Sequence, residues 1–192
     1  MDGNKLKPIL EALFAASDKP LSVSFIFDLF AGDIAQPAKD DIRQAIKELM
    51  AQYQAGGMEL KQVASGFRLQ VKPAYEVWVS RLWDQKPPRY SRALLETLAL
   101  IAYRQPITRG EIEDIRGVSI SSNMIKTLQE REWVKPLGHK DVPGRPTLYG
   151  TTKSFLDYFN LKSLNELPTL AEIGDLDQYH PELPLGEKTR SA

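Results

Sequence analysis

The sequence predicts a mainly α-helical fold with small β-hairpins, of the α+β class, arranged as two tandem winged helix-turn-helix domains. Two observations lead to this prediction. The first is a helix, a sharp stop and a second helix within SRALLETLALIAYRQPITRGEIEDIRG, residues 91–117. The second is a copy of this unit near the start of the chain, where KPLSVSFIFDL at 19–29 resembles QPITRGEIEDI at 105–115. Internal self-similarity of this kind indicates a repeated structural unit.

The stretch at 91–117 carries a signal for each helix and for the turn between them. Apolar residues recur at helical spacing on the first helix, at Leu94, Leu95, Leu98, Ile101 and Ala102. Pro106 ends this helix because it has no N–H and its ring clashes with the preceding turn. Thr108 and Glu111 form a capping box that starts the second helix. Gly117 suits the left-handed position just past the end of that helix.

The two copies can be aligned through the turn without a gap, and equivalent positions are expected to play equivalent roles. The matched pairs are Ser22 with Thr108, Ile26 with Ile112, and Leu29 with Ile115. We expect the first pair to cap the second helix of each copy. The other two pairs are expected to face the core, because they lie three residues apart on one helical face.

Each copy continues with a third helix, a hairpin and a fourth helix, which together make a winged helix-turn-helix. In the first copy these are expected at 37–53, at 58–63 with 67–71, and after Pro73. In the second copy they are expected within 121–131, at 133–137 with 147–150, and at 151–159. The predicted domains are 1–84, a Pro-rich linker at 85–90, and 91–170, with a flexible tail at 171–192. Leucines that could dock the end of the second domain on its core are Leu161, Leu164, Leu167 and Leu170.

The composition is that of an ordinary globular protein, and it limits the classes of function. Lys and Arg number 25, as do Asp and Glu, so the net charge is zero. A protein that coats nucleic acid usually carries excess positive charge. Cysteine is absent, which excludes disulfides and thiolate chemistry. The start resembles no signal peptide, and no apolar run is long enough to span a bilayer, so we expect a cytoplasmic protein without membrane contact.

No group of residues indicates catalysis. The two histidines, His139 and His180, lie in the predicted second wing and in the tail. No zinc-protease, P-loop or dinucleotide-binding motif is present. We therefore expect no enzyme activity, no metal, no cofactor and no small-molecule substrate.

Two classes of function remain after this exclusion. A winged helix can bind DNA, and Lys126, Lys140 and Arg145 are the candidate contacts in the second copy. Residues 91–160 contain ten Lys and Arg against eight Asp and Glu, a net charge of +2. This is small for a phosphate-binding surface, so we expect DNA binding to be weak or indirect. A protein-binding module fits the charge balance better.

Two aromatic residues in the first copy are in excess of what the core requires. Phe25 and Phe27 occupy the positions of Glu111 and Glu113 in the second copy. Exposed aromatic side chains usually mark a contact surface, so we expect the first domain to dimerise through these two residues. The alternative is that the fourth helix, with Trp78 and Trp83, buries them within the same domain.

Three longer segments resemble a known family. TLALIAYRQPITRGEIEDIRGV at 97–118, KDVPGRPTLYGTT at 140–152 and FLDYFNLKSLNELP at 155–168 are similar to the segregation and condensation protein B family. This family supplies the kleisin-interacting, tandem winged-helix subunit of the bacterial condensin-like SMC complex. The resemblance is specific over 92–170 and looser in the first domain, where ILEALFAASDKPLS at 9–22 fits the opening helix and turn.

The resemblance implies a non-enzymatic adaptor that acts in chromosome condensation and partition during cell division. Such a protein would be a nucleoid-associated homodimer, joined through its N-terminal modules. Its C-terminal modules would bind the central region of the kleisin, segregation and condensation protein A, and through it the SMC ATPase. Our candidates for the partner-binding face of the second domain are Leu98, Tyr103, Arg109, Glu113 and Arg116. The alternative function is a winged-helix DNA-binding transcriptional regulator.

Overall fold

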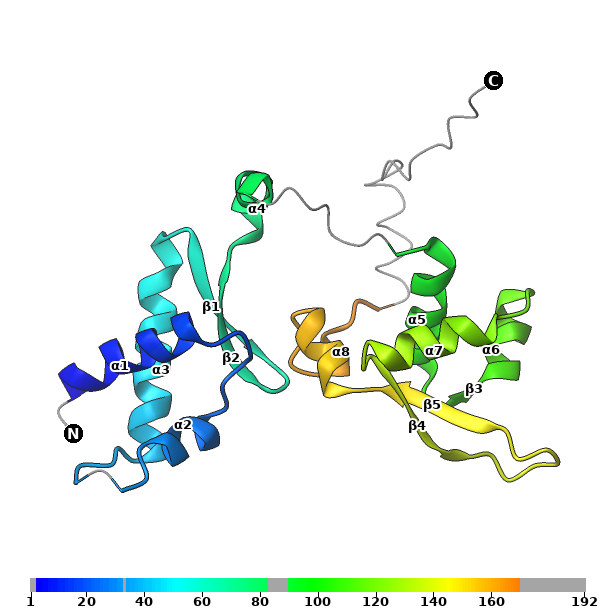
Figure 1. Ribbon diagram of the computed structural model, residues 1–192, viewed down its shortest axis with the longest axis horizontal. Helices are drawn as coiled ribbons and strands as arrows, with labels where there is room; N and C mark the ends of the chain where they lie inside the picture. The colour runs from blue at the N-terminus through cyan, green and yellow to red at the C-terminus, as the bar shows by residue number, and fades with distance from the viewer. Residues whose placement is uncertain (1–2, 33, 83–89, 170–192) are drawn as a thin grey trace.

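The computed structural model describes residues 3–32, 34–82 and 90–169, which form a mixed α/β structure with small antiparallel sheets (Figure 1). These residues bury two separate hydrophobic cores. We call residues 3–82, which contain one core, the first module. Residues 90–169, which contain the other, are the second module. Within the described ranges no helix has both the length and the apolar character needed to cross a membrane.

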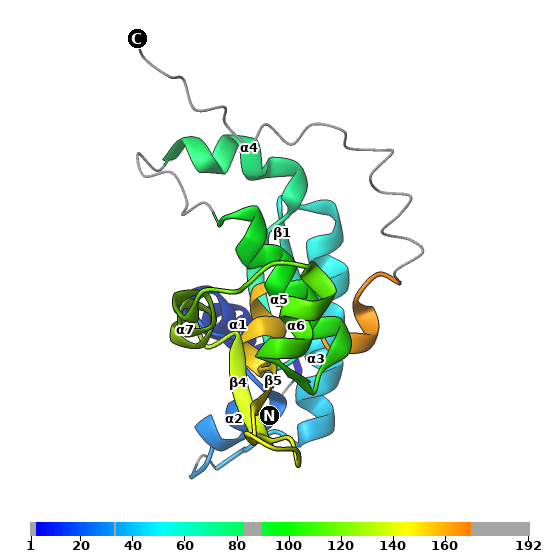
Figure 2. The same ribbon diagram turned by 90° about the vertical axis from the view of Figure 1, so that its right-hand side faces the viewer.

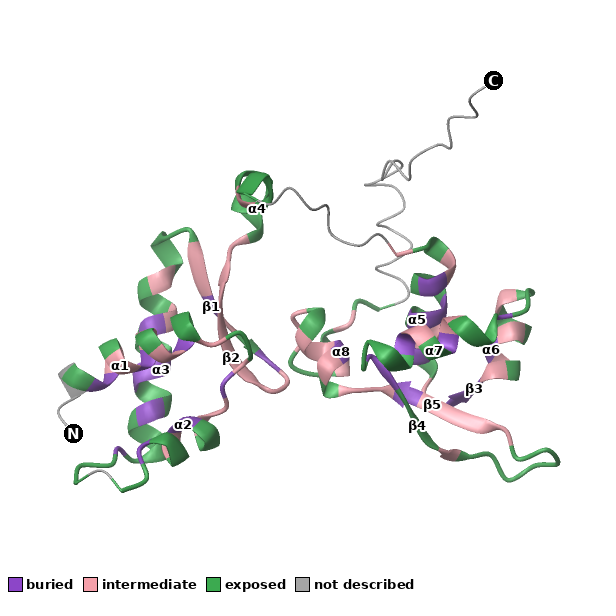
Figure 3. Cartoon of the chain, viewed as in Figure 1, coloured by how far each residue is buried: buried purple, intermediate pink, exposed green. Residues whose placement is uncertain are grey.

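The first module has three helices, a two-stranded sheet and a short helical segment. Its elements are α1 (Gly3–Ala16), α2 (Val23–Leu29), α3 (Lys39–Gln52), the 3-10 turn η1 (Tyr53–Ala55), β1 (Met58–Val63), β2 (Gly66–Val71), η2 (Pro73–Tyr75), α4 (Glu76–Val79) and η3 (Ser80–Leu82). The apolar face of α3 provides much of the core, through Ile42, Ala45, Ile46 and Leu49. Figure 3 shows this buried face along α3.

The second module repeats this order and adds a strand. Its elements are α5 (Arg92–Arg104), β3 (Ile107–Thr108), α6 (Arg109–Arg116), α7 (Ser122–Glu130), β4 (Val134–His139), β5 (Thr147–Thr151), α8 (Lys153–Tyr158) and the 3-10 turn η4 (Leu164–Glu166). The three strands form one antiparallel sheet in the order β3-β5-β4. The helices expected from the sequence are therefore present, while the short strand β3 was not anticipated.

The turn between the first two helices has the same construction in both modules. Leu21 pairs with Phe67 of β2, and Ile107 pairs with Tyr149 of β5. These contacts join the residue before each helix cap to the sheet. The repeat in the sequence therefore has a counterpart in the backbone pairing. Gly66 is required at this contact, because a Cβ there would lie 2.3 Å from the backbone oxygen of Leu21.

The capping signals read from the sequence are confirmed. The Ser22 hydroxyl accepts a hydrogen bond from the N–H of Phe25 at 3.1 Å. The Thr108 hydroxyl accepts from the N–H of Glu111 at 3.3 Å, while the Glu111 carboxylate accepts the N–H of Thr108 at 2.8 Å. This is a complete capping box. Gly117 ends α6 in the left-handed conformation, with φ of 69°.

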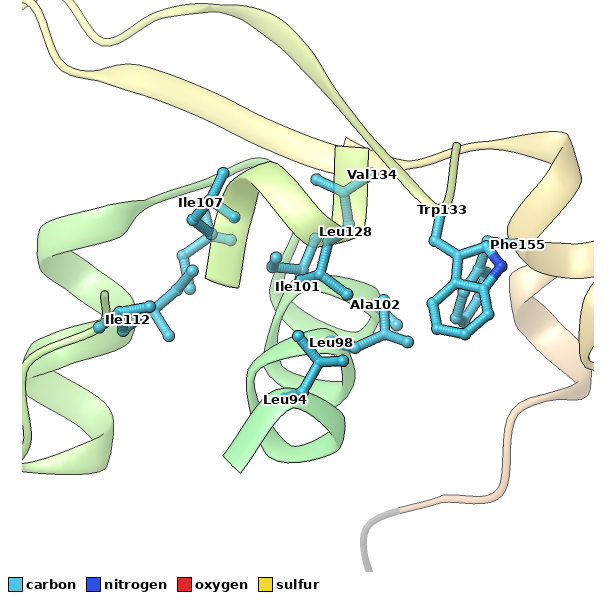
Figure 4. Close-up of a cluster of buried hydrophobic side chains, with 12 residues drawn as sticks. Leu94, Leu98, Ile101, Ala102, Ile107, Ile112, Leu128, Trp133, Val134 and Phe155 are labelled. Carbon is cyan, nitrogen blue, oxygen red and sulfur yellow. The ribbon is translucent and has the colours of Figure 1, made fainter. Parts of the chain in front are cut away.

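The core of the second module gathers on α5. Leu94, Leu98, Ile101 and Ala102 meet side chains from α6, α7, the sheet and α8 (Figure 4). Trp133 is buried at the edge of this core beside Phe155. Leu161, Leu164 and Leu167 pack on the same core and are partly buried, as expected for a docked extension. Leu170, the linker at 85–89 and the tail at 171–192 lie outside the described residues.

Two positions expected in the core are instead exposed. Leu29 is 49% exposed and Ile115 is 54% exposed. They are equivalent positions, so the prediction was wrong in the same way in both copies. Only one residue of each short helix, Ile26 or Ile112, is fully buried. Phe30 and Ile120, which follow the two helices, are buried and contribute to the two cores.

The difference between Ile112 and Ile115 gives a matched test of this fold. Ile112→Ala should lower the free energy of unfolding by about 2–5 kcal/mol, because it opens a cavity in a closed core. Ile115→Ala should change it by about 0.5 kcal/mol or less, because its side chain lies mostly in water. Urea unfolding followed by tryptophan fluorescence measures both. Equal losses would contradict the packing of α6.

Candidate partner-binding surface

A row of side chains on α5 faces away from the core. Leu95, Ala99 and Tyr103 lie four residues apart, so they form one ridge along the helix. Leu95 is 42% exposed, Ala99 is exposed and Tyr103 is half-buried. The sequence places Leu95 on the apolar face of α5, but that face is wider than the core can cover. The uncovered ridge is therefore an apolar surface in contact with water.

The ridge separates two adjoining hollows in the described part of the second module. One, of about 340 Å³, lies between α5, α8 and the extension after α8. It is lined by Leu95, Leu98, Ala99, Ala102, Tyr103, Phe155, Phe159, Leu161, Leu167 and Pro168. The other, of about 430 Å³, lies between α5 and α6. It is lined by Glu96, Ala99, Leu100, Tyr103, Arg104, Ile115 and Arg116. Together we call these hollows the α5 groove.

Both walls of the α5 groove are held by specific contacts. On one side the Tyr103 hydroxyl donates to the Pro168 carbonyl at 2.6 Å, which fixes the extension against α5. On the other side Arg116 donates to the hydroxyl of the buried Thr97 at 3.2 Å and pairs with Glu96 at 3.0 Å. The Arg116 side chain is only 10% exposed. These contacts tie α6 to α5 and keep the groove in one shape.

The groove has the chemistry of a site for apolar side chains of another protein segment. Carbon atoms line most of it, and the charged residues Glu96, Arg104 and Arg116 lie on the α6 side. Grooves of this type bind amphipathic segments, with pockets for the apolar residues and a polar rim that sets orientation. Among the described residues no three His, Asp or Glu side chains are grouped so as to hold a metal ion.

The five residues predicted for this face have different positions. Tyr103 lines both hollows, and Arg116 lines the one beside α6. Leu98 lines the hollow beside α8 but is 3% exposed and belongs to the core. Arg109 and Glu113 lie away from the groove, between α6 and the segment leading to α7. The structure therefore brings three of the five to one surface.

Arg109 and Glu113 fasten the turn between α6 and α7. The guanidinium of Arg109 contacts Glu113 at 3.0 Å and Ser122 at 3.0 Å, and it also donates to the Ile120 carbonyl. The Glu113 carboxylate accepts the N–H of Ile120 at 2.8 Å. This backbone hydrogen bond, together with Arg109, lowers the pKa of Glu113. Each residue therefore has several partners within the module.

Several groove residues were not identified from the sequence. They are Leu95, Ala99, Leu100, Ile115, Phe159, Leu167 and Pro168. Helical spacing assigns Leu95 and Ile115 to the core, and an alanine such as Ala99 gives no signal by itself. The signal in the sequence that could have identified this surface is the width of the apolar face of α5. A face wider than the core can cover indicates that one edge of the helix stays exposed.

The candidate DNA contacts lie on exposed parts of the second module, and two of the three are paired with carboxylates. Lys126 lies 3.6 Å from Glu130 on α7. Lys140, in the β4–β5 loop, lies 2.6 Å from Glu111. Arg145 is exposed near the tip of the same loop, which projects from the sheet (Figure 1). Each carboxylate offsets a positive charge that a phosphate would need.

The first module exposes apolar side chains on α2, at Ile34 in the loop that follows it, and on the segment from η2 to η3. On α2, Phe25 is 51% exposed, while Phe27 is half-buried against the core with Lys39 Nζ 5.0 Å from its ring centre. The segment from η2 to η3 exposes Tyr75, Val77, Trp78 and Leu82. Figures 1 and 2 show α4 and α2 at opposite ends of the module. The fourth helix with Trp78 therefore does not bury Phe25; Trp83 lies outside the described residues.

Comparison with known proteins identifies close relatives over most of the chain. The family model described as "Segregation and condensation complex subunit ScpB" matches residues 8–170. The chain is 51% identical over 183 residues to the Segregation and condensation protein B homolog of Coxiella burnetii, covering 95% of this chain and 86% of that protein. It is 44% identical over 178 residues to Segregation and condensation protein B of Syntrophotalea carbinolica, covering 92% and 87%. A solved structure, ScpB from Mycobacterium tuberculosis, is 28% identical with a TM-score of 0.37, covering 84% of this chain and 98% of that one.

The contact between Glu111 and Lys140 should make the stability of the protein depend on pH. Lys140 and the backbone and hydroxyl of Thr108 lower the pKa of Glu111 from 4.5 to about 2. A carboxylate with a lowered folded-state pKa stabilises the fold above its unfolded pKa, and that contribution is lost as the pH falls toward 2. Glu111→Gln should therefore lose less stability than the wild type between pH 4.5 and 2.

Urea unfolding at a series of pH values measures this difference. Asp141→Asn, which removes an exposed carboxylate from the β4–β5 loop, serves as the control and should follow the wild type. If Glu111→Gln also followed the wild type over this range, the role of the capping box carboxylate in pH-dependent stability would be refuted.

Proposed function

This chain belongs to the ScpB family of segregation and condensation complex subunits, and we propose on that premise that it is a non-enzymatic adaptor. In this proposal it binds the kleisin of a bacterial SMC complex, segregation and condensation protein A. Through the kleisin it connects to the SMC ATPase, and it acts in chromosome condensation and partition during cell division. The proposed place of action is the cytoplasm, at the nucleoid.

The observation that carries the proposal is the α5 groove. It presents an apolar ridge, Leu95, Ala99 and Tyr103, between walls that are already held by hydrogen bonds. A preformed groove loses little conformational entropy when a partner binds, so its exposed apolar area can contribute directly to affinity. An adaptor needs such a surface, and it needs no reactive groups. We assign the groove to the central region of the kleisin.

Transcriptional regulation through DNA binding is the weaker candidate. Lys126 and Lys140 are paired with carboxylates, and Arg109 is engaged with Glu113 and Ser122. DNA affinity depends largely on cations that are free to neutralise phosphates. The arrangement of the second module as a winged helix is thus better suited to binding protein than to binding DNA.

We also propose that the protein forms a homodimer through its first module. This module exposes large apolar side chains on α2 and on the segment around α4, and clusters of this kind mark contact surfaces. The original candidates were Phe25 and Phe27. Because Phe27 packs against the core, only Phe25 of this pair offers most of its ring to a second copy.

A single charge at the centre of the groove should disrupt kleisin binding. Ala99→Glu keeps a good helix former on α5 but places a carboxylate between the two hollows. We expect the affinity for the kleisin's central fragment to fall by about tenfold or more, measured by isothermal titration calorimetry. Ala51→Glu, the same change at an exposed alanine of α3, should leave the affinity unchanged. Equal affinities for the two variants would refute the groove assignment.

Light scattering on the chain alone tests the dimer. The wild type should have twice the mass of a 21.7 kDa chain. Phe25→Glu and Trp78→Glu each place a charge on one exposed surface, and the variant that halves the mass identifies the dimer contact. Circular dichroism checks that both variants remain folded. A monomeric wild type, or two folded variants that both stay dimeric, would rule out the surfaces proposed here.

A further inference from the structure

The tip of the first hairpin contacts the second module instead of projecting into water. The turn between β1 and β2 consists of Ala64 and Ser65, which follow the last ladder pair, Val63 with Gly66. Both turn residues donate their backbone N–H to the end of α8. The N–H of Ala64 reaches the Leu161 carbonyl at 3.0 Å, and the N–H of Ser65 reaches Asp157 Oδ1 at 2.9 Å.

A side-chain contact beside the turn extends this interface. Arg68 Nη2 of β2 lies 2.5 Å from Asn160 Oδ1, while its Nε donates to Gln70 at 3.0 Å. Arg68 and Asn160 are both half-buried. The Asp157 carboxylate and the Arg68 guanidinium each take part in a charge-assisted hydrogen bond, and such bonds are stronger than neutral ones. Figure 1 shows the hairpin tip pointing toward α8.

The end of α8 has a conformation suited to receive the hairpin. Asn160 is left-handed, with φ of 60°, and the N–H of Leu161 closes onto the Leu156 carbonyl at 2.8 Å. This arrangement is a Schellman motif, in which asparagine or glycine occupies the left-handed position. It turns the Leu161 carbonyl and the Asn160 side chain out of the helix. Three acceptors, the Leu161 carbonyl, Asp157 Oδ1 and Asn160 Oδ1, then face three donors of the hairpin, the N–H groups of Ala64 and Ser65 and the guanidinium of Arg68.

We propose that the β1–β2 hairpin is an intramolecular docking element that latches the end of α8 and holds the two modules in one arrangement. The first hairpin would therefore differ in role from the β4–β5 loop, whose tip is exposed. The latch fixes the direction in which the α5 groove opens relative to the first module, because Leu161 takes part in both. Interfaces between domains of one chain usually permit relative motion, so these hydrogen bonds would decide whether the two modules move independently.

The position of Asn160 allows a selective variant. Asn160→Gly keeps a residue that favours the left-handed cap but removes the acceptor of Arg68. Combined with Asp157→Ala, it removes both side-chain acceptors from α8. Arg68→Gln weakens the same interface from the first module and leaves α8 unchanged. Lys153→Ala, an exposed position at the start of α8, is the matched control.

Distances between spin labels in the two modules test the latch without any partner protein. Cysteine is absent from the chain, so Ala51→Cys on α3 and Lys126→Cys on α7 can be labelled selectively. Pulsed dipolar spectroscopy is done on labelled chain mixed with an excess of unlabelled chain, so that only distances within one chain are measured. We expect one narrow distance distribution for the labelled chain and for Lys153→Ala.

The latch variants should broaden this distribution. The Asp157→Ala, Asn160→Gly double variant should give a distance distribution several-fold wider than that of the unmodified background. Arg68→Gln should also widen the distribution, but by a smaller factor. If the α8 pair failed to fold by circular dichroism, Arg68→Gln would still provide the test. A broad distribution in the unmodified background, or folded variants with the same narrow distribution, would overturn the proposal.

Discussion

Helix α5 has more apolar surface than its own module can cover, and much of the second module follows from this constraint. Its inner face places Leu94, Leu98 and Ile101 in the core, where each buried side chain contributes about 1.5–3 kcal/mol of transfer free energy. Its outer ridge is covered only at one side by the extension after α8. The remaining apolar area is in contact with water, and in our proposal a partner protein covers it. On that proposal, the inner face of α5 contributes to stability and its outer face to binding.

Several cations of the second module connect one of its elements to another. Arg116 joins α6 to α5, Arg109 joins α6 to the start of α7, and Lys140 joins the β4–β5 loop to α6. The Arg116 side chain is nearly buried, so its removal would leave the Thr97 hydroxyl without this donor and Glu96 with Arg92 as its remaining partner. A chain with equal numbers of both charges can satisfy its cations internally. Each cation paired in this way is less available to neutralise a phosphate.

The two copies share one turn and use their hairpins differently. In both, a residue just before the helix cap pairs with a strand, and a hydroxyl caps the following helix. The first hairpin then meets the end of α8, and the second loop meets α6 through Lys140. The two units therefore share the backbone geometry of the turn, while their hairpin tips make different contacts.

The sequence alone determined the order of the helices and the ends of α6, because these depend on local physical chemistry, but it did not indicate the short strand β3. Thr108 with Glu111 and Gly117 identify the limits of α6, and the repeat indicates that the first module has the same turn. Tertiary structure decided which apolar residues are exposed and which are buried. Leu29 and Ile115 have core spacing but are exposed, whereas Phe30 and Ile120, outside the two helices, are buried. The α5 groove depends on how separate elements pack against one another, and so does the contact of Ser65 with Asp157, 92 residues away in the sequence. Helical periodicity describes a single helix, so it cannot indicate which distant elements come into contact.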